Sequence, residues 1–213
     1  PTVFNPVLGP HRRFDWLRTS IRDVKTIRQA LGGTLNDAVL ATVTGGARRF
    51  LEGRGEPVEQ LDFRAMVPVS IRAAEERGQS GNRVANFVVP LPIGEPDSAV
   101  RYHRIVEEMQ RQKAAHTVQG SELIEEIADW TVTGVLTRTI QLAADRLAWN
   151  LVVTNVPGPQ LPLFLLDAPL EAAYPMVPLF RQQGIGIALF SYDGNLYWGV
   201  NADWDALPDL HEV

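Results

Sequence analysis

The sequence predicts an α/β protein in which helices pack on a mixed sheet. Apolar runs of strand length occur at residues 84–91 and 151–156. Other segments carry apolar residues at helical spacing, most clearly residues 32–53. Near the end of the chain, Asp193-Gly194 separates two apolar runs, which is a strong antiparallel hairpin signal. Strands and helices therefore do not alternate strictly, and this favours a mixed sheet over an all-parallel one.

The composition is that of a globular protein and excludes several functional classes. The 213 residues are 45% hydrophobic and 21% charged, with a net charge of −5 and no dense run of lysine and arginine. This balance argues against a nucleic-acid partner held by phosphate contacts. The absence of cysteine excludes disulfides and thiolate metal sites. No apolar run reaches the roughly 18 residues of a membrane span, and no signal-peptide pattern is present. We therefore expect a cytoplasmic protein.

The first residues predict an extended lead-in followed by a short strand and a helix. Residues 1–13 contain three prolines, so they form either the end of a linker or a strap over another surface. A short strand is expected at 14–19. Ser20 is a suitable N-cap for a helix over 21–31. The chain begins without methionine, and we interpret it as a fragment of a longer protein.

The most complete helix signal lies in residues 32–53. Thr34 is a good N-cap, and Asp37 three residues later completes a variant capping box. Leu35, Val39 and Phe50 fall near one face of this helix. Asn36 and Asp37 therefore open a helix whose body is expected to be buried. This polar pair either caps the helix or braces a site beyond its end.

The remaining elements follow from apolar runs and from turn residues. A strand is predicted at 61–71, where an internal proline demotes part of it to an edge, a bulge or a strand end. Asp97 is expected to cap a helix from 98 to about 115, and 121–148 is expected to be helical with a break. The segments predicted after these are a strand at 151–156, irregular structure at 160–180, a hairpin of 185–191 with 196–202, and the start of a truncated helix at 207–210.

The residues alone show no complete active site. None of the four histidines has a partner at metal-ligand spacing, and neither a nucleophile elbow nor a phosphate-binding glycine loop is present. We therefore expect no metal and no permanently bound cofactor.

Six short motifs, in this order along the chain, carry a family resemblance. They are Asn36-Asp37-x-Val39-Leu40-Ala41 with Gly46-x-x-Arg49, Val67-Pro68-Val69-Ser70-x-Arg72, Gly81-Asn82, Asn155-Val156-Pro157-Gly158-Pro159, Tyr174-Pro175 and Ser191-Tyr192-Asp193-Gly194. Together they resemble the C-terminal half of the bacterial wax ester synthase/acyl-CoA:diacylglycerol acyltransferases. These enzymes belong to the CoA-dependent acyltransferases with the chloramphenicol-acetyltransferase-like fold.

The resemblance implies a fold, an activity and a missing part. The fold consists of two similar halves with an active-site tunnel between them, so residues 14–213 would be the C-terminal domain. The family transfers a fatty acyl group from acyl-CoA to diacylglycerol or a long-chain alcohol, in triacylglycerol and wax ester synthesis. Its general base is a histidine of a His-His-x-x-x-Asp-Gly motif in the N-terminal half, and this chain has no adjacent histidines.

This absence implies that no catalytic residue lies in the chain and that the chain alone is inactive. The implied partners are the N-terminal half, acyl-CoA as substrate and the acceptor alcohol. Peripheral attachment to the inner membrane or to lipid droplets would fit such substrates.

The resemblance also implies site residues, each with a structural alternative. Asn36 and Asp37 would support the catalytic centre, and the alternative is plain capping by Asp37 with Asn36 in solvent. The implied contacts to substrate or CoA are Ser70, Arg72, Gly81, Asn82, Asn155, Pro157, Gly158 and Tyr174. Their alternatives are a solvated loop arginine, a simple turn at 81–82, a structural stop over 155–159 and a core loop over 174–180.

Two other functional classes compete with this interpretation. One is a non-catalytic acyl-CoA-binding or scaffold domain of the same fold, which would lack the histidine motif upstream. The other is a self-sufficient hydrolase that uses His103 or His116, which predicts activity in this chain alone.

Overall fold

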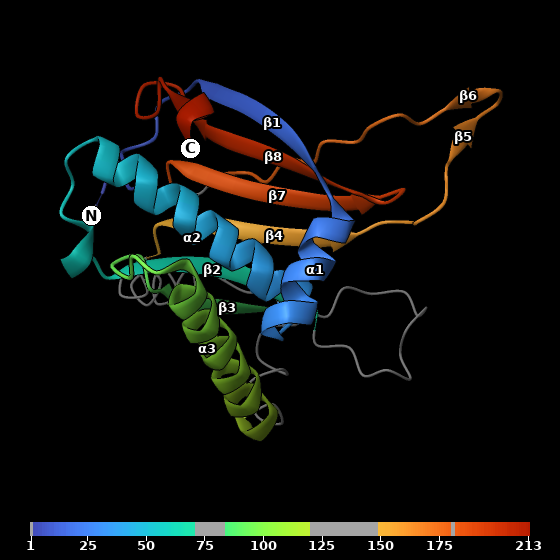
Figure 1. Cartoon of the computed structure of the whole chain (residues 1–213). Coiled ribbons are helices and arrows are strands. Elements are labelled where there is room, and N and C mark those ends of the chain that lie inside the picture. Colours follow the sequence, from blue (N-terminus) through green and yellow to red (C-terminus); the bar gives the residue numbers. More distant parts are fainter. Residues whose placement is uncertain (1, 71–83, 120–148, 180–181) are drawn as a thin grey trace, which may run out of the picture.

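The computed structural model describes residues 2–70, 84–119, 149–179 and 182–213, and these form one layer of helices on a mixed sheet (Figure 1). Strands β2, β4 and β7 run parallel to one another, and the other neighbouring pairs are antiparallel. The order across the six-stranded sheet is β1 (Arg12–Ser20), β8 (Asn195–Asp203), β7 (Ile185–Tyr192), β4 (Leu151–Pro157), β2 (Phe63–Ser70) and β3 (Val84–Leu91). The predicted fold class is confirmed.

Three helices cover one face of the sheet: α1 (Ile21–Leu31), α2 (Leu35–Gly53) and α3 (Ser98–Gln119). The predicted caps are present. Ser20 accepts a hydrogen bond from the amide of Arg22 at 3.1 Å, and Asp97 accepts from the first-turn amides of α3. Helix α3 runs four residues past its predicted end at 115. No described helix combines the length and the hydropathy that crossing a membrane requires.

Helix α2 is the central element of the helical layer, and it packs against both α1 and α3. On its inner side, Val39, Leu40 and Leu51 are each at most 1% exposed. Burial of such an aliphatic side chain contributes about 1.5–3 kcal/mol each. The predicted capping box at its start is confirmed, because the side chains of Thr34 and Asp37 each accept a hydrogen bond from the other residue's amide.

The predicted strands are present, with small differences at their ends. Pro68 lies inside β2, but the β2–β4 ladder pairs only Ala65 with Leu151 and Met66 with Val152. At Pro68, β4 no longer pairs with β2. The missing N–H of Pro68 therefore removes no hydrogen bond between the described strands. The hairpin of β7 and β8 is confirmed, with positive φ at Asp193 and Gly194 as a type I′ turn requires.

The lead-in residues pack against the core. Phe4 is fully buried, stacked on Phe50 at a centroid distance of 5.7 Å and edge-on to Phe63 at 5.8 Å. Strand β1 begins at Arg12, two residues before the predicted start. The irregular segment after β4 contains a small hairpin of β5 (Phe164–Leu165) and β6 (Ala168–Pro169). Short 3₁₀ turns lie at Val58–Gln60 and Leu210–Glu212. The predicted helical region 121–148 lies outside the described residues.

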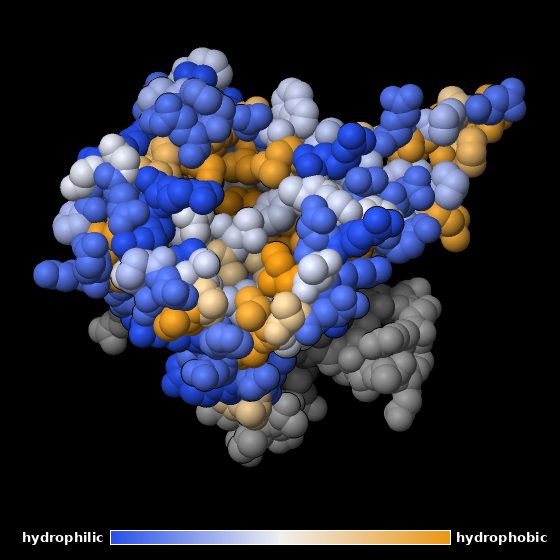
Figure 2. Space-filling model, viewed as in Figure 1, coloured by the Kyte–Doolittle hydropathy of each residue, from blue (hydrophilic) through white to orange (hydrophobic). Residues whose placement is uncertain are grey.

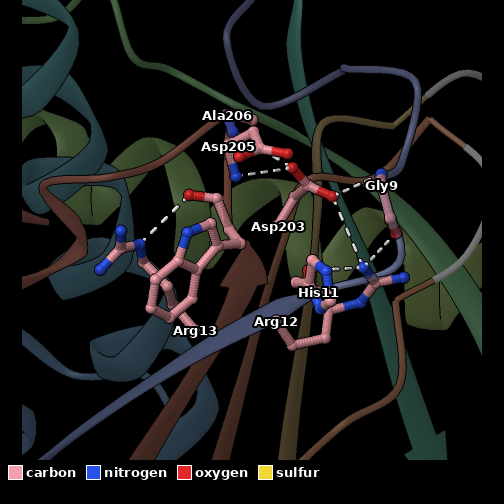
Figure 3. Close-up of polar contacts among 8 residues, drawn as sticks. Gly9, His11, Arg12, Arg13, Asp203, Asp205 and Ala206 are labelled. Carbon is pink, nitrogen blue, oxygen red and sulfur yellow. Dashed lines mark hydrogen bonds and ion pairs between the residues drawn. The ribbon is translucent and has the colours of Figure 1, made fainter.

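A buried carboxylate fixes the lead-in to the end of β8 (Figure 3). Asp203 is 2% exposed, and it accepts hydrogen bonds from the amides of Gly9, Asp205 and Ala206 at 2.8–3.1 Å. Arg12 lies 3.5 Å from the same carboxylate and also donates to the carbonyl of Gly9. Burial alone would raise the pKa of Asp203, but these amides and the Arg12 charge together hold the pKa below its usual value.

Candidate functional site

The candidate site lies at the edge of the sheet where the parallel strands end. Because β2, β4 and β7 run in the same direction, their last residues, Ser70, Pro157 and Tyr192, lie along one edge, which we call the carboxyl edge. In open α/β sheets, ligands bind outside this edge. The N-terminus of α2 reaches the same edge, since its first turn contacts the end of β4. A helix N-terminus adds unpaired N–H groups and a partial positive charge there.

Two asparagines join α2 to β4 at the carboxyl edge. The side-chain Nδ2 of Asn155 donates a hydrogen bond to Oδ1 of Asn36 at 2.8 Å. The Oδ1 atom of Asn155 is buried and has no hydrogen-bond partner within the structure. Since a buried acceptor without a partner is costly, this oxygen is a candidate acceptor for a donor from outside the described residues. Asn36 is therefore paired rather than solvated, and the structure brings together two of the predicted site residues.

Asp37 caps the N-terminus of α2 together with Thr34. It is 2% exposed, and its Oδ2 accepts from the Thr34 amide at 2.6 Å and from the Thr34 hydroxyl at 2.8 Å. Its other oxygen, Oδ1, is buried and has no hydrogen-bond partner among the described residues. Asp37 thus performs the capping role given as the alternative, and through the cap it also fixes the position of Asn36 on the first turn.

Tyr102 of α3 lies beside this cap. Burial first, and then the negative charge of Asp37, raise the pKa of Tyr102 above its usual value, and Arg28 offsets this only in part. The phenol therefore stays neutral and donates a hydrogen bond to the carbonyl of Gly32 at 2.7 Å. The loop that precedes α2 is in this way fixed to α3 as well as to α2 itself.

A small pocket opens at the asparagine pair. Its cavity volume is about 10 Å³, which is room for no more than about one water molecule. Ligand pockets usually enclose at least about 300 Å³, so this pocket is too small to enclose a substrate. It can form one wall of a larger site. The pocket is lined by Asn36, Val39, Leu40, Val67, Val153 and Asn155.

The turn after β4 packs on the end of β7. The amide of Gly158 donates to the hydroxyl of Ser191 at 3.1 Å, and Gln160 accepts from the amide of Gly194 at 3.2 Å. A Cβ atom at Gly158 would lie 2.3 Å from the carbonyl oxygen of Ser191 and 2.4 Å from the ring of Phe190. This close packing explains why position 158 is a glycine. It agrees with the structural alternative for this segment, in which the segment ends the strand. Pro157 is the last residue of β4 and is exposed.

Of the other predicted site residues that the structure describes, Tyr174 lies away from the asparagine pair. Tyr174 packs on Tyr197 at 5.3 Å and on Trp16 at 6.0 Å. Tyr197 alternates with the core residues Leu196 and Trp198, so Tyr174 lies over the sheet face opposite the helices. Ser70 ends β2 opposite Val84. Arg72, Gly81 and Asn82 lie outside the described residues. Substrate contact by these residues remains a prediction.

Some residues of this region were not predicted as site residues. Ser191 receives the turn after β4, and Tyr102 closes the loop before α2. Ser191 belongs to one of the six motifs, which was the available signal. For Tyr102 the only signal in the sequence was its position on the predicted helix from 98 to about 115, which is mostly charged outside its apolar stripe.

The described site residues include no group suited to act as a general base. The asparagine amides do not take up protons at neutral pH, and one oxygen of Asp37 is already used by the cap. His103 and His211 are exposed, and His103 lies edge-on to the ring of Tyr102. Within the described ranges, no three metal-ligating side chains come together. The two asparagine amides can therefore orient a neighbouring group, and they do not themselves transfer a proton.

Comparison with known proteins gives consistent matches. Residues 80–213 match the family model described as the WS/DGAT C-terminal domain. Two Mycobacterium tuberculosis (strain H37Rv) proteins named as diacylglycerol O-acyltransferases are 34% and 30% identical to the chain, over 100% and 98% of its length. The chain covers only 46% of each, so it spans about half the length of these curated relatives.

Solved structures show the same fold. The wax ester synthase/diacylglycerol acyltransferase from Marinobacter aquaeolei VT8 superimposes with a TM-score of 0.79 at 22% identity, over 99% of this chain and 47% of that one. The nonribosomal peptide synthetase FmoA3 superimposes with a TM-score of 0.60 at 17% identity, over 100% of this chain and 23% of that one.

Proposed function

The chain belongs to the WS/DGAT family as its C-terminal domain, and on that premise we propose that it is one half of an acyl-CoA-dependent O-acyltransferase. In this proposal the whole enzyme transfers a fatty acyl group from acyl-CoA to diacylglycerol or to a long-chain alcohol. The carboxyl edge with the asparagine pair faces the other half. Acyl-CoA is a substrate, and no permanently bound cofactor is invoked.

The observation that carries the proposal is the hydrogen bond between Asn36 and Asn155 at a site without a base. The bond joins two segments that are 119 residues apart, and the buried oxygen Oδ1 of Asn155 has no hydrogen-bond partner in the described part of the chain. The adjoining pocket is too small to enclose a substrate by itself. A half-site of this kind supports a function in which a second domain supplies both the facing wall and the proton-transfer group.

The proposed reaction assigns positioning to this half. A histidine of the other half takes the proton from the acceptor hydroxyl as its oxygen attacks the thioester carbonyl. The C–O bond forms, the C–S bond breaks, and the proton passes to the departing CoA thiolate. The amides of Asn36 and Asn155 offer neutral donors and acceptors to groups that cross the edge. Asp37 and Thr34 keep Asn36 at the position where this is effective.

The remaining site residues enter the proposal as substrate contacts. Ser70, Pro157 and Gly158 end or follow strands at the carboxyl edge, where a CoA group would pass. Arg72, Gly81 and Asn82, which lie outside the described residues, enter the proposal on the family resemblance alone. Tyr174 lies over the sheet face opposite the helices. It would contact the substrate only if part of the substrate ran along that face. A peripheral location at the inner membrane or at lipid droplets would bring the enzyme to its lipid substrates.

The test is a double-mutant cycle in the protein at its natural length. Asn36→Ala, Asn155→Ala and the double variant are assayed for transfer of a radiolabelled acyl group from acyl-CoA to diacylglycerol and to a fatty alcohol. Loss of orientation is expected to lower kcat by roughly 10- to 100-fold in each single variant. If the two amides act as a pair, the double variant falls no further than either single variant. Gln110→Ala, which removes an exposed amide on α3, serves as the matched control.

Thermal unfolding of each variant separates orientation from stability. Full activity in both single variants would refute the positioning role of the pair. A natural-length protein that binds acyl-CoA, transfers no acyl group and lacks adjacent histidines would instead be a non-catalytic binding domain.

A further inference from the structure

Helix α1 runs along the carboxyl edge, from the end of β1 towards the asparagine pair. Strand β1 is antiparallel to β8 and therefore parallel to β7, so its last residue, Ser20, lies at the carboxyl edge. Ser20 also caps α1, and the amide of Ile21 donates to the carbonyl of Gly194 in the β7–β8 turn at 3.1 Å. Helix α1 contacts β1 and β8 as well as α2 and α3. In Figure 1 it crosses the end of the sheet at which α2 begins.

The length of α1 matches the width of the sheet between β1 and the asparagine pair. Neighbouring strands lie about 4.8 Å apart, so the three steps from β1 through β8 and β7 to β4 cover about 14 Å. The 11 residues of α1, at about 1.5 Å each, extend about 16 Å. Near its end, Arg28 donates to the carbonyl of Gly33 at 3.4 Å, in the loop that leads to α2. Helix α1 therefore borders the edge from β1 to the turn that carries Asn36.

The cations of α1 gather on one side of this helix. Arg22, Lys25 and Arg28, which we call the cation row, follow one another at intervals of three residues, so they fall within an arc of about 120°. All three residues are exposed. The one acid of α1, Asp23, lies outside this arc, so the row is a positive surface on a chain whose net charge is −5. The space-filling view in Figure 2 shows a mainly hydrophilic surface over α1.

The cation row has no carboxylate partner within the described part of the chain. None of its three side chains makes an ion pair there. In contrast, the exposed cations Arg104 and Arg111 of α3 each form an ion pair with a glutamate, at 2.9 and 2.5 Å. Like charges at helical spacing repel one another, so the row is destabilising until an anion lies against it.

Acyl-CoA is an anionic ligand that suits this row. It carries a diphosphate and a ribose phosphate, and guanidinium and ammonium groups bind phosphate oxygens by charge-assisted hydrogen bonds. Its pantetheine arm separates these phosphates from the thioester, so they bind away from the reacting carbonyl. If the thioester lies at the asparagine pair, a CoA group that follows the carboxyl edge brings its phosphates to α1.

A membrane with anionic lipids fits the row less well. A helix that lies in a membrane interface presents a wide apolar face to the lipid. On α1, Ile27 is the one large apolar side chain among the exposed residues, and it is 39% exposed. Val24 is 8% exposed because it packs on the protein itself. The exposed surface of α1 therefore suits a polar phosphate ligand better than a lipid surface.

We propose that Arg22, Lys25 and Arg28 bind the phosphate groups of acyl-CoA and thereby hold its thioester at the asparagine pair. This rests on the proposed function, in which acyl-CoA is the substrate. None of the three residues belongs to the motifs that carry the family resemblance or to the substrate contacts inferred from it. The cation row binds the ligand and takes no part in proton transfer.

The test compares CoA with analogues that lack one or all of its phosphates, in the protein at its natural length. Binding of CoA, 3′-dephospho-CoA and pantetheine is measured by isothermal titration calorimetry. In the triple substitution Arg22→Ala/Lys25→Ala/Arg28→Ala, which we call the α1 variant, the Kd of CoA is expected to rise roughly tenfold. The Kd of 3′-dephospho-CoA is expected to rise less, and the Kd of pantetheine is expected to stay the same.

A matched control removes the same charge elsewhere. Arg49→Ala/Arg104→Ala/Arg111→Ala takes three exposed cations from α2 and α3, and the Kd of CoA is expected to change by less than about twofold. The variant Arg22→Lys/Arg28→Lys keeps the charge of the row and is expected to retain most of the affinity for CoA. Thermal unfolding of each variant confirms that the protein is folded under the conditions of the titration.

Two results of the titration would overturn the proposal. One is an unchanged Kd of CoA in the α1 variant. The other is an equal rise for CoA and for pantetheine, because the lost contact would then not be a contact to phosphate. Flotation with phosphatidylglycerol vesicles distinguishes the lipid source. An α1 variant that loses vesicle binding and keeps its affinity for CoA would assign the row to a membrane and overturn the proposal as well.

The proposed function and the phosphate site fail separately, because binding is measured without turnover. A protein that transfers acyl groups and shows the same Kd of CoA in the α1 variant retains the proposed function and loses the phosphate site. A protein that transfers no acyl group, and in which the α1 variant weakens CoA binding but not pantetheine binding, retains the phosphate site and loses the function.

Discussion

Removal of the Asp37 carboxylate tests whether the cap of α2 stabilises the helical layer and the site above it. In Asp37→Ala, the hydrogen bonds to the Thr34 amide and hydroxyl, at 2.6 and 2.8 Å, are both lost. A hydrogen bond to a charged group contributes about 1.5–3 kcal/mol. Because Thr34 is exposed, water replaces part of the lost hydrogen bonding. Removal of the Asp37 carboxylate, which is 2% exposed, also relieves the cost of its desolvation. We expect a net loss of about 2 kcal/mol.

The loss is measured by thermal and urea unfolding. For a protein of this size, 1 kcal/mol corresponds to a change of about 2–4 °C in Tm, so Asp37→Ala is expected to lower Tm by about 4–8 °C. Asp23→Ala is the matched control. Asp23 occupies the same third position in the first turn of α1 but is exposed, and the change there is expected to be below about 0.5 kcal/mol.

Equal effects of the two substitutions would refute the reasoning, because the capping geometry would then contribute nothing beyond a surface charge near a helix N-terminus. An increase in Tm for Asp37→Ala would show that the cost of burying the carboxylate exceeds the value of its two hydrogen bonds.

Two further outcomes test the packing of the lead-in and the buried acid. Phe4→Ala removes a fully buried ring and is expected to cost about 3–5 kcal/mol in urea unfolding, whereas a loose lead-in would cost almost nothing. The pKa of Asp203 is lower in the folded protein than in the unfolded chain, so its contribution is complete above the ordinary carboxyl pKa and is lost as the pH falls through the folded pKa. As the pH is lowered from about 5 to about 3, the free energy of unfolding is therefore expected to fall less in Asp203→Asn than in the wild type. Parallel pH profiles of the two proteins would contradict this.

Local signals predicted the elements that depend on neighbouring residues. The Thr34-x-x-Asp37 box needs only one turn of helix to form, and its geometry is the one predicted. The Asp193-Gly194 turn likewise depends on φ preferences of its own two residues. The order of six short motifs indicated the family, which the comparisons confirm.

Contacts between distant segments could not be predicted in the same way. The bond between Asn36 and Asn155 depends on the order of strands and on the helix that covers them, and neither residue carries a local signal for the other. Phe4 lies in a proline-rich lead-in that local reasoning treats as extended, yet the hydrophobic core takes it up. The root of the β5–β6 hairpin is held by the hydroxyl of Tyr192, which is 22 residues from Leu170 and 29 from Leu163 along the chain.

The central claim is that this chain completes an acyltransferase whose base lies in another half, and one assay tests it directly. Acyl transfer from acyl-CoA to diacylglycerol and to a long-chain alcohol is measured for the natural-length protein and for residues 1–213 alone. The account predicts transfer by the natural-length protein and none by residues 1–213. Turnover by residues 1–213 alone would contradict it. If that turnover is hydrolysis of acyl-CoA and is lost in His103→Ala or His116→Ala, the chain has a self-sufficient hydrolytic site.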